Sequence, residues 1–221
     1  GSLGSPKITV TYCSGCEPLT HASHTTVYYG FGASGDVSGI QDGDLVHLTD
    51  NNKARISGDG GTIEVIGSWN TVVLFGDFNE FTMLGSANIG TINGNGNMVI
   101  TTGFGTAAGT MTGLEVNGWA NMVNVDGCAV SVGVSSSNMI SICGGSGDPI
   151  YATIDSNCNV TVNGFNSDIQ LAGNNTDLQF LSPASGNDVN ITGNNNSVGK
   201  NGTTNNTVVI QPNTIGNVVG K

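Results

Sequence analysis

A nine-residue repeat runs through most of the chain. Five consecutive units begin at residues 63, 72, 81, 90 and 99 and share the pattern apolar-x-apolar-x-Gly-x-x-Asn-x. The asparagine of the pattern is found at Asn70, Asn79, Asn88, Asn97, Asn121 and Asn196. Related apolar segments continue at 114–118, 123–127, 140–144, 160–164, 169–173, 178–182 and 189–193. A fixed short period of this kind predicts a solenoid, in which similar units stack on one another.

Each unit predicts one short strand followed by a turn. Alternation such as Ile63/Val65 gives a strand with one buried face. The glycine permits a positive φ or a close backbone approach at the bend. The asparagine tolerates left-handed backbone, which suits the corner, and stacked asparagines can form a ladder. Two units make an 18-residue coil with about four inward side chains, so residues 56–210 give a rod roughly 40 Å long.

Two other architectures share parts of this pattern. A three-sided coil of 27 residues has the same strand spacing. A β-sandwich with tight hairpins also has alternating apolar residues and frequent glycine. The unbroken nine-residue register over five units favours an all-β solenoid of about 18 residues per coil.

The chain divides into a short leader, a non-repetitive segment and the repeat. Residues 1–5 resemble a cloning remnant. Residues 6–50 do not follow the repeat but contain strand-like runs, and they predict an N-terminal β cap that covers the first coil, or a head that docks a partner. Residues 51–221 predict the solenoid.

The repeat is interrupted near 104–113, 144–151 and 182–188. Insertions in a solenoid project as loops from one edge, and such loops often carry function.

Composition and charge limit the classes of partner. The net charge is −11, with only five lysines and arginines. Nucleic-acid binding and attraction to an anionic membrane both require clustered basic residues, so both are disfavoured. No apolar stretch approaches the roughly 20 residues that cross a bilayer. A surface rich in Asn, Thr, Ser and Gly is typical of extracellular proteins on a cell or virion.

Three apolar side chains are predicted to point outward. Ile66 and Leu84 are expected to stack on one sheet, and Phe75 to lie on the other. Exposed apolar residues on a regular rod imply a covering element. That element is either the folded-back cap or a second subunit of a homo-oligomer.

Four potential zinc ligands lie close together near the N-terminus: Cys13, Cys16, His21 and His24. Thiolates and imidazoles are the ligands that zinc prefers, and this set can complete a tetrahedron. Its first part resembles a zinc knuckle, although Thr26 stands where that motif has its last cysteine. The alternative is a Cys13–Cys16 disulfide, or a free pair, beside exposed histidines. The other cysteines, at 128, 143 and 158, are expected to be buried in the seam of the solenoid.

The repeat resembles that of parallel β-helix and β-roll proteins, which occur on cell surfaces, in virus fibres and among secreted adhesins. The resemblance implies the fold and a surface role. It implies no calcium site, because the aspartates do not recur at one position of the unit as they do in the calcium β-roll. These aspartates are Asp59, Asp77, Asp126, Asp155 and Asp168.

The leading functional prediction is a non-enzymatic, adhesin-like surface or fibre protein that binds a glycan or a cell-surface partner. A carbohydrate-active enzyme is one alternative, but it needs two suitably spaced carboxylates. Glu64 is expected beside Thr82 and Glu115 beside Gly133, while the insertion at 182–188 leaves the register of Asp168 and Asp188 open. An ice- or stress-associated protein is the other alternative, and it needs regular threonine rows that the sequence lacks.

Overall fold

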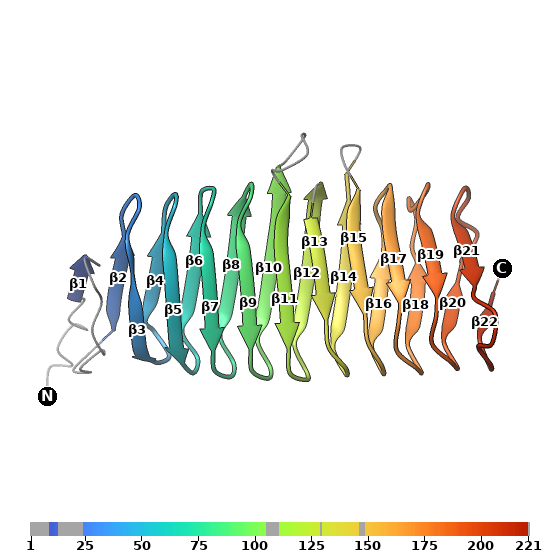
Figure 1. The fold of residues 1–221 in the computed structure, drawn as a ribbon, viewed down its shortest axis with the longest axis horizontal. Helices are drawn as coiled ribbons and strands as arrows, with labels where there is room; N and C mark the ends of the chain where they lie inside the picture. The colour runs from blue at the N-terminus through green and yellow to red at the C-terminus, as the bar shows by residue number, and fades with distance from the viewer. Residues whose placement is uncertain (1–8, 13–23, 105–110, 129, 146–148, 221) are drawn as a thin grey trace, which may run out of the picture.

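The protein is a two-sided parallel β-solenoid without helices among the residues that the structure describes (Figure 1). The structure is a computed structural model and describes residues 9–12, 24–104, 111–128, 130–145 and 149–220. Successive strands alternate between two sheets, so each coil contributes one strand to each. The two-sided coil is therefore confirmed over the three-sided one and over a hairpin sandwich.

The first sheet, here called the even sheet, contains twelve described strands. They are β1 (Thr9–Tyr12), β2 (Thr25–Tyr29), β4 (Leu45–Leu48), β6 (Thr62–Ile66), β8 (Glu80–Gly85), β10 (Met98–Phe104), β12 (Met122–Cys128), β14 (Met139–Gly144), β16 (Asn159–Val162), β18 (Asp177–Phe180), β20 (Ser197–Gly199) and β22 (Val218–Val219).

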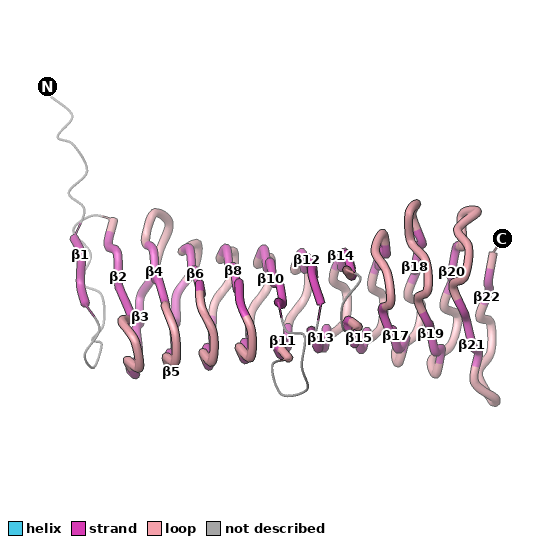
Figure 2. The backbone as a smooth tube through the Cα atoms, turned by 90° about the horizontal axis from the view of Figure 1, so that it is seen from above, coloured by secondary structure: helices cyan, strands magenta, loops and turns pink. Residues whose placement is uncertain are grey.

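The second sheet, here called the odd sheet, contains ten described strands. They are β3 (Ser34–Ile40), β5 (Lys53–Gly58), β7 (Thr71–Phe75), β9 (Ile89–Asn93), β11 (Thr112–Asn117), β13 (Val130–Val134), β15 (Ile150–Ile154), β17 (Ser167–Leu171), β19 (Asp188–Ile191) and β21 (Thr207–Ile210). Figure 2 shows the strands succeeding one another along a single rod axis.

The core is a narrow apolar seam between the two sheets. Each regular coil supplies about four inward side chains, such as Ile63, Val65, Val72 and Leu74, all completely buried. Aromatic and sulfur side chains such as Phe81 and Met83 fill the same positions in the next coil. Parallel strands lie about 4.8 Å apart, so the eleven spacings of the even sheet give a rod about 53 Å long. The rod exceeds the expected 40 Å because four strands outside residues 56–210 also join the even sheet: β1, β2, β4 and β22.

The N-terminal segment joins the same two sheets. β2 and β4 pair in parallel within the even sheet, and β3 pairs with β5 in the odd sheet with an irregular register after Ser38. The described part of the segment is therefore built as coils. Residues 1–8 and 13–23 of the predicted cap lie outside the described residues.

The two edges of the rod differ. Turns of three to five residues lead from each odd strand to the next even strand as far as β20, along one edge, here called the short edge. The last connection on this edge, 211–217, is longer. The predicted insertions all connect an even strand to the next odd strand: β10 to β11, β14 to β15 and β18 to β19. They therefore share the opposite edge, here called the loop edge (Figure 1).

The turns confirm the predicted backbone of glycine in the earlier coils but not that of asparagine. Positive φ is found at Gly67, Gly76 (146°), Gly85, Gly94, Gly118 and Gly127, whereas Gly144, Gly164, Gly173 and Gly193 lie outside the left-handed region. A Cβ on Gly76 would collide with the carbonyl oxygen of Gly58 in the preceding coil, so no larger residue fits. The repeat asparagine was predicted to adopt left-handed backbone, and this is wrong. The residue before it does so, as at Phe78 (φ 58°), while Asn79 is buried.

Two ladders of buried asparagines hold the coils together. On the short edge, the backbone N–H of Asn79 donates to Oδ1 of Asn97 at 2.8 Å, and that of Asn97 donates to Asn121 at 2.9 Å. The Nδ2 group of Asn97 also donates to the Gly76 carbonyl at 3.1 Å. Asn52, Asn70 and Asn88 form the ladder of the loop edge. The predicted ladder is confirmed, and it satisfies corner backbone groups that no strand partner reaches.

Candidate functional site

Two large aromatic side chains stand exposed on the short edge. Phe78 follows β7 and is 72% exposed, and Trp119 follows β11 and is 62% exposed. Their turns are separated by the turn at 94–97, so the two residues are two coils apart, or about 10 Å along the rod. The ring of Phe78 lies over Gly96, where an added Cβ would approach ring atoms Cδ1 and Cε1 to 2.7 Å.

The backbone conformation of Phe78 is unfavourable for a phenylalanine. Its φ of 58° is left-handed, a region that Asn and Gly adopt readily and that costs other residues about 1 kcal/mol or more. The corresponding positions of the other short-edge turns also have positive φ but carry smaller side chains: Gly60, Gly96, Ala120, Ser137, Asn157, Asn175 and Asn195. The exposed ring recovers little of that cost by burial. A strained and exposed aromatic residue is a reason to infer a contact role.

A hydrogen-bonded row of polar side chains runs beside Phe78 and ends at Trp119. Asp59 Oδ1 accepts the backbone N–H of Asp77 at 2.8 Å, and Asp77 Oδ1 accepts that of Asn95 at 2.7 Å. Asn95 Oδ1 accepts the N–H of Trp119 at 3.0 Å, and its Nδ2 donates to Asp77 at 3.3 Å. Each side chain is thereby held on the turn of the following coil.

This arrangement combines flat apolar surfaces with fixed hydrogen-bond acceptors. A carboxylate can accept at both oxygens, so the second oxygens of Asp59 and Asp77 have acceptor capacity beyond the bonds to the backbone. Rings that pack against the C–H face of a ligand, beside groups that bind its hydroxyls, suit a saccharide. We define Asp59, Asp77, Phe78, Asn95 and Trp119 as the short-edge site.

The sequence contained part of the signal for this site. Trp69, Phe78 and Trp119, like Phe31, Phe165 and Ile215, interrupt turn positions that are mostly small or polar, and this is visible in the sequence. Their exposure and the alignment of Phe78 and Trp119 on one edge depend on the two-sided coil. No binding role was predicted for them.

The loop edge also carries exposed aromatic residues. Phe31 is 80% exposed, and Trp69, with φ 65°, lies two coils further along. Their polar neighbours include Asp50, whose Oδ1 accepts the N–H of Ser68 at 2.6 Å. The row then continues with serine, as the N–H of Ser86 donates to Ser68 Oγ at 3.3 Å. This edge therefore offers fewer carboxylate and amide groups than the short-edge site.

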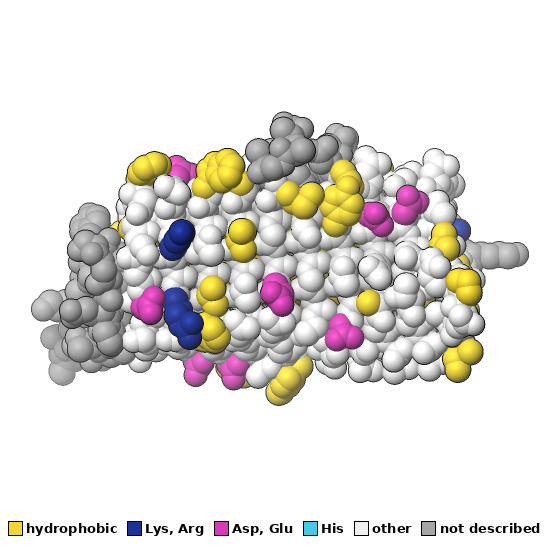
Figure 3. Space-filling view, in the orientation of Figure 1, with side chains coloured by type: hydrophobic (Ala, Val, Ile, Leu, Met, Phe, Trp, Pro, Cys, Tyr) yellow, Lys and Arg dark blue, Asp and Glu magenta, His cyan; other side chains and the backbone are white. Residues whose placement is uncertain are grey.

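The register of the acidic residues is now settled. Asp168 and Asp188 are paired neighbours on β17 and β19, and both are exposed on the odd sheet. They border an open hollow of about 420 Å³ that is also lined by Asn190 and Gln211. Glu64 pairs with Thr82 and Glu115 with Gly133, as predicted. Figure 3 shows few charged side chains on the face it presents, some of them close to a neighbour of the same sign.

The three predicted apolar surface residues lie where expected. Ile66 and Leu84 are paired neighbours on the even sheet, and Ile66 is about half exposed. Phe75 lies on the odd sheet, where the guanidinium carbon of Arg55 stands 4.4 Å from the ring centroid. Arg55 thus covers part of Phe75, and the homo-oligomer interface stays a prediction.

The proposed zinc set cannot be assembled from the described residues. Cys13, Cys16 and His21 lie outside them, while His24 is exposed and packs against Gly43. Within the described ranges, no group of three or more His, Cys, Asp or Glu side chains is arranged to hold a metal ion. Zinc therefore stays a prediction.

The cysteine prediction was wrong for Cys143 and is confirmed for Cys158. Cys143 lies partly exposed on the outer face of β14. Cys158 is buried and belongs to the hydrophobic core, at its corner after β15. Cys158 replaces the ladder asparagine: its Sγ donates to the Ser135 carbonyl at 3.3 Å, and burial raises the pKa of its thiol. Of Cys128, the structure describes only the strand position.

Comparison with protein-family models, curated proteins and solved structures found no match to the chain. Among the described residues, no helix has the length and apolar character that spanning a membrane requires. The function is therefore argued from the geometry alone.

Proposed function

We propose that the protein is a non-enzymatic surface or fibre rod that binds an extended glycan along its short edge. The observation that carries the proposal is Phe78, a bulky ring held in left-handed backbone and left exposed beside a fixed row of acceptors, two coils from the exposed Trp119. Two rings two coils apart support alternate sugar units of a chain that runs parallel to the rod. An extracellular location on a cell or virion surface follows from this role.

The solenoid can bind a ligand on its outer surface but not inside its seam. Its seam is filled by side chains such as Phe81 and Phe180, so it has no room for an internal ligand. Because the edge is rigid, the contact residues have their final spacing before the ligand binds, and this lowers the entropy cost of binding a long ligand. A cell-surface protein in place of a glycan is the competing partner for the same residues.

The test is a glycan array followed by calorimetry on the best ligand. We expect Phe78→Asn and Trp119→Asn each to weaken binding at least tenfold, which corresponds to about 1.4 kcal/mol. Ile89→Thr is the matched control, because it removes a similarly exposed apolar side chain from the odd sheet. Loss of binding with Trp69→Asn but not with Phe78→Asn would place the site on the loop edge and contradict the proposal.

The carbohydrate-active enzyme has one supporting observation, the Asp168–Asp188 pair beside its open hollow. Retaining glycosidases place two carboxyl groups about 5 Å apart on the two sides of the scissile bond. Here both side chains extend from one flat face, which favours binding over bond cleavage. Release of reducing sugar by the wild type, abolished in Asp168→Asn, would establish the enzyme instead.

A further inference from the structure

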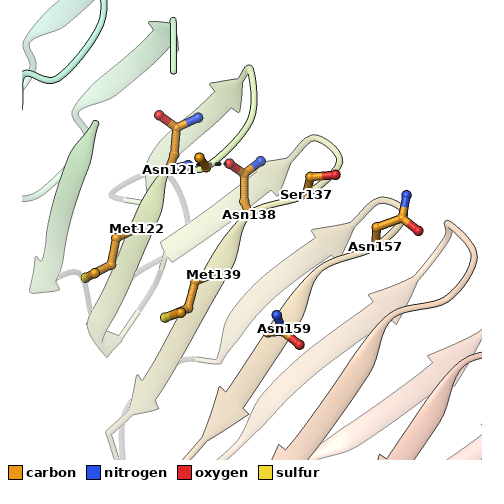
Figure 4. A pocket seen from close by; sticks show the side chains of 8 residues that line it. Asn121, Met122, Ser137, Asn138, Met139, Asn157 and Asn159 are labelled. Atoms are coloured by element: carbon orange, nitrogen blue, oxygen red, sulfur yellow. Dashed lines mark hydrogen bonds between the residues drawn. The ribbon is translucent and has the colours of Figure 1, made fainter. Parts of the chain in front are cut away.

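Three methionines occupy one row on the outer face of the even sheet. Met98 pairs with Met122, and Met122 pairs with Met139, on the adjacent strands β10, β12 and β14. They are 43%, 53% and 55% exposed, and they account for three of the five methionines in the chain. Figure 4 shows the Met122 and Met139 side chains extending to the same side of their strands.

Neither strand propensity nor packing explains this row. Outward strand positions favour β-branched residues, and Thr62 fills the same row on β6. The methionines do not fill the seam, and the hollow that Met122 and Met139 line is otherwise mostly polar, with Ser137, Asn157 and Asn159. What methionine provides and a β-branched side chain lacks is a flexible, polarisable thioether.

The geometry allows the three sulfur atoms to converge. Adjacent parallel strands are about 4.8 Å apart, and a methionine side chain has three rotatable bonds beyond its Cα. Met98 and Met139 can therefore both reach over Met122. Met122 and Met139 line a hollow of about 300 Å³ that is open to solvent.

We propose that Met98, Met122 and Met139 form a binding site for a soft monovalent cation, Cu(I) or Ag(I). Thioethers select such ions, whereas Mg²⁺ and Ca²⁺ prefer oxygen ligands. Three neutral ligands suit a single positive charge. The carboxylate of Glu80, next to Met98 in the same row, and the net charge of −11 both favour a cation. The site is independent of the proposed glycan site.

The experiment is a titration of the full chain with Ag(I), which requires no redox change, after the thiols are blocked with N-ethylmaleimide. Methionine methyl groups labelled with ¹³C report each site by NMR. We expect the methyl signals of Met98, Met122 and Met139 to shift together and to saturate at about one ion per chain. The signals of buried Met83 and of Met111, on the loop edge, should not move.

Substitution by leucine removes the sulfur and keeps an apolar side chain. Met122→Leu should weaken Ag(I) binding at least tenfold, and Met111→Leu should leave it unchanged. Unchanged affinity in folded Met122→Leu, or an equal shift of the Met111 methyl, would overturn the proposal. A row that instead binds an apolar partner would retain that partner in the leucine variant and show no selective response to Ag(I).

Discussion

The residue before each ladder asparagine has left-handed backbone whatever its side chain. The φ angles are 65° at Trp69, 58° at Phe78, 55° at Ala87 and 54° at Asn195. Only Gly and Asn adopt this region at little cost. The stacking of the coils therefore imposes the turn, and the side chain at this position is free to serve another purpose.

Replacement of Trp69 by asparagine should stabilise the protein. We expect an increase of about 1 kcal/mol in the free energy of unfolding, because the exposed ring contributes little packing and asparagine relieves the backbone strain. Urea unfolding measures the change. Trp119→Asn is the control, since Trp119 is equally exposed and its φ is not positive. Equal effects of the two substitutions would show that strain is not the cause.

Tyr29 should make stability fall at alkaline pH. Its side chain is buried and its hydroxyl donates to the Gly35 carbonyl at 2.8 Å. Burial, with a smaller contribution from the charge of Asp36, raises the pKa of Tyr29 well above its usual value near 10. The folded state therefore keeps a proton that the unfolded state loses above about pH 10, so this contribution is present below that pH and declines above it.

Urea midpoints measured from pH 8 to 11 test this expectation. Tyr29→Phe should reduce the alkaline decline, at the cost of one hydrogen bond at neutral pH. Tyr151→Phe, at an exposed tyrosine on β15, controls for the loss of a phenol. The same decline in Tyr29→Phe and the wild type would assign it to another group.

At the scale of the element, the strands depend on the ladders at their ends. Strand pairing satisfies backbone groups within each sheet, but the corners leave N–H and C=O groups that only a side chain can reach. Several ladder asparagines accept from the preceding coil and donate to that same coil, as Asn79 does with Gly61 and Gly58. Asn70 instead donates to Ser68 and Asn88. Thr176 performs part of this role where the asparagine is absent, since its hydroxyl accepts the N–H of Cys158 at 3.3 Å.

Asn97→Ala should destabilise the protein by about 2–4 kcal/mol. The substitution leaves the Asn79 N–H and the Gly76 carbonyl without partners in a buried corner, and each such group costs about 1–3 kcal/mol. Chemical denaturation measures the loss. Asn124→Ala, at an exposed outward position of β12, should change stability by no more than about 0.5 kcal/mol. A loss below 1 kcal/mol for Asn97→Ala would mean that water forms the hydrogen bonds to the backbone groups that Asn97 no longer reaches.

At the scale of the whole molecule, stability is expected to vary along the rod. Each coil contacts only its neighbours, so a solenoid behaves as a nearly one-dimensional array. In the central coils the inward side chains are fully buried, whereas Ile210 and Val219 in the last described coil are 43% and 37% exposed. The last coil therefore has weaker support than the middle.

Hydrogen exchange followed by mass spectrometry should reproduce this gradient in the 221-residue chain. We expect amides of β20, β21 and β22 to exchange at least tenfold faster than those of β8 and β10, because local opening at an end breaks fewer contacts. Peptides from the two regions of one sample provide the internal control. Uniform protection along the rod would indicate a fully cooperative solenoid.

The nine-residue pattern by itself determined the strands, the inward residues and the asparagine ladder, because alternation and period are local properties that stacking repeats. It also placed Ile66 beside Leu84, since equal spacing fixes the neighbour one coil away. Only the tertiary structure decided that the coil has two sides and that Asp168 stands beside Asp188. The number of sides depends on how sharply the backbone bends at each corner. The pairing of Asp168 with Asp188 depends on the path of the inserted residues at 182–188. The row of Met98, Met122 and Met139 also depended on the tertiary structure. Connections of unequal length separate the three strands, so the sequence alone does not show that these residues are paired.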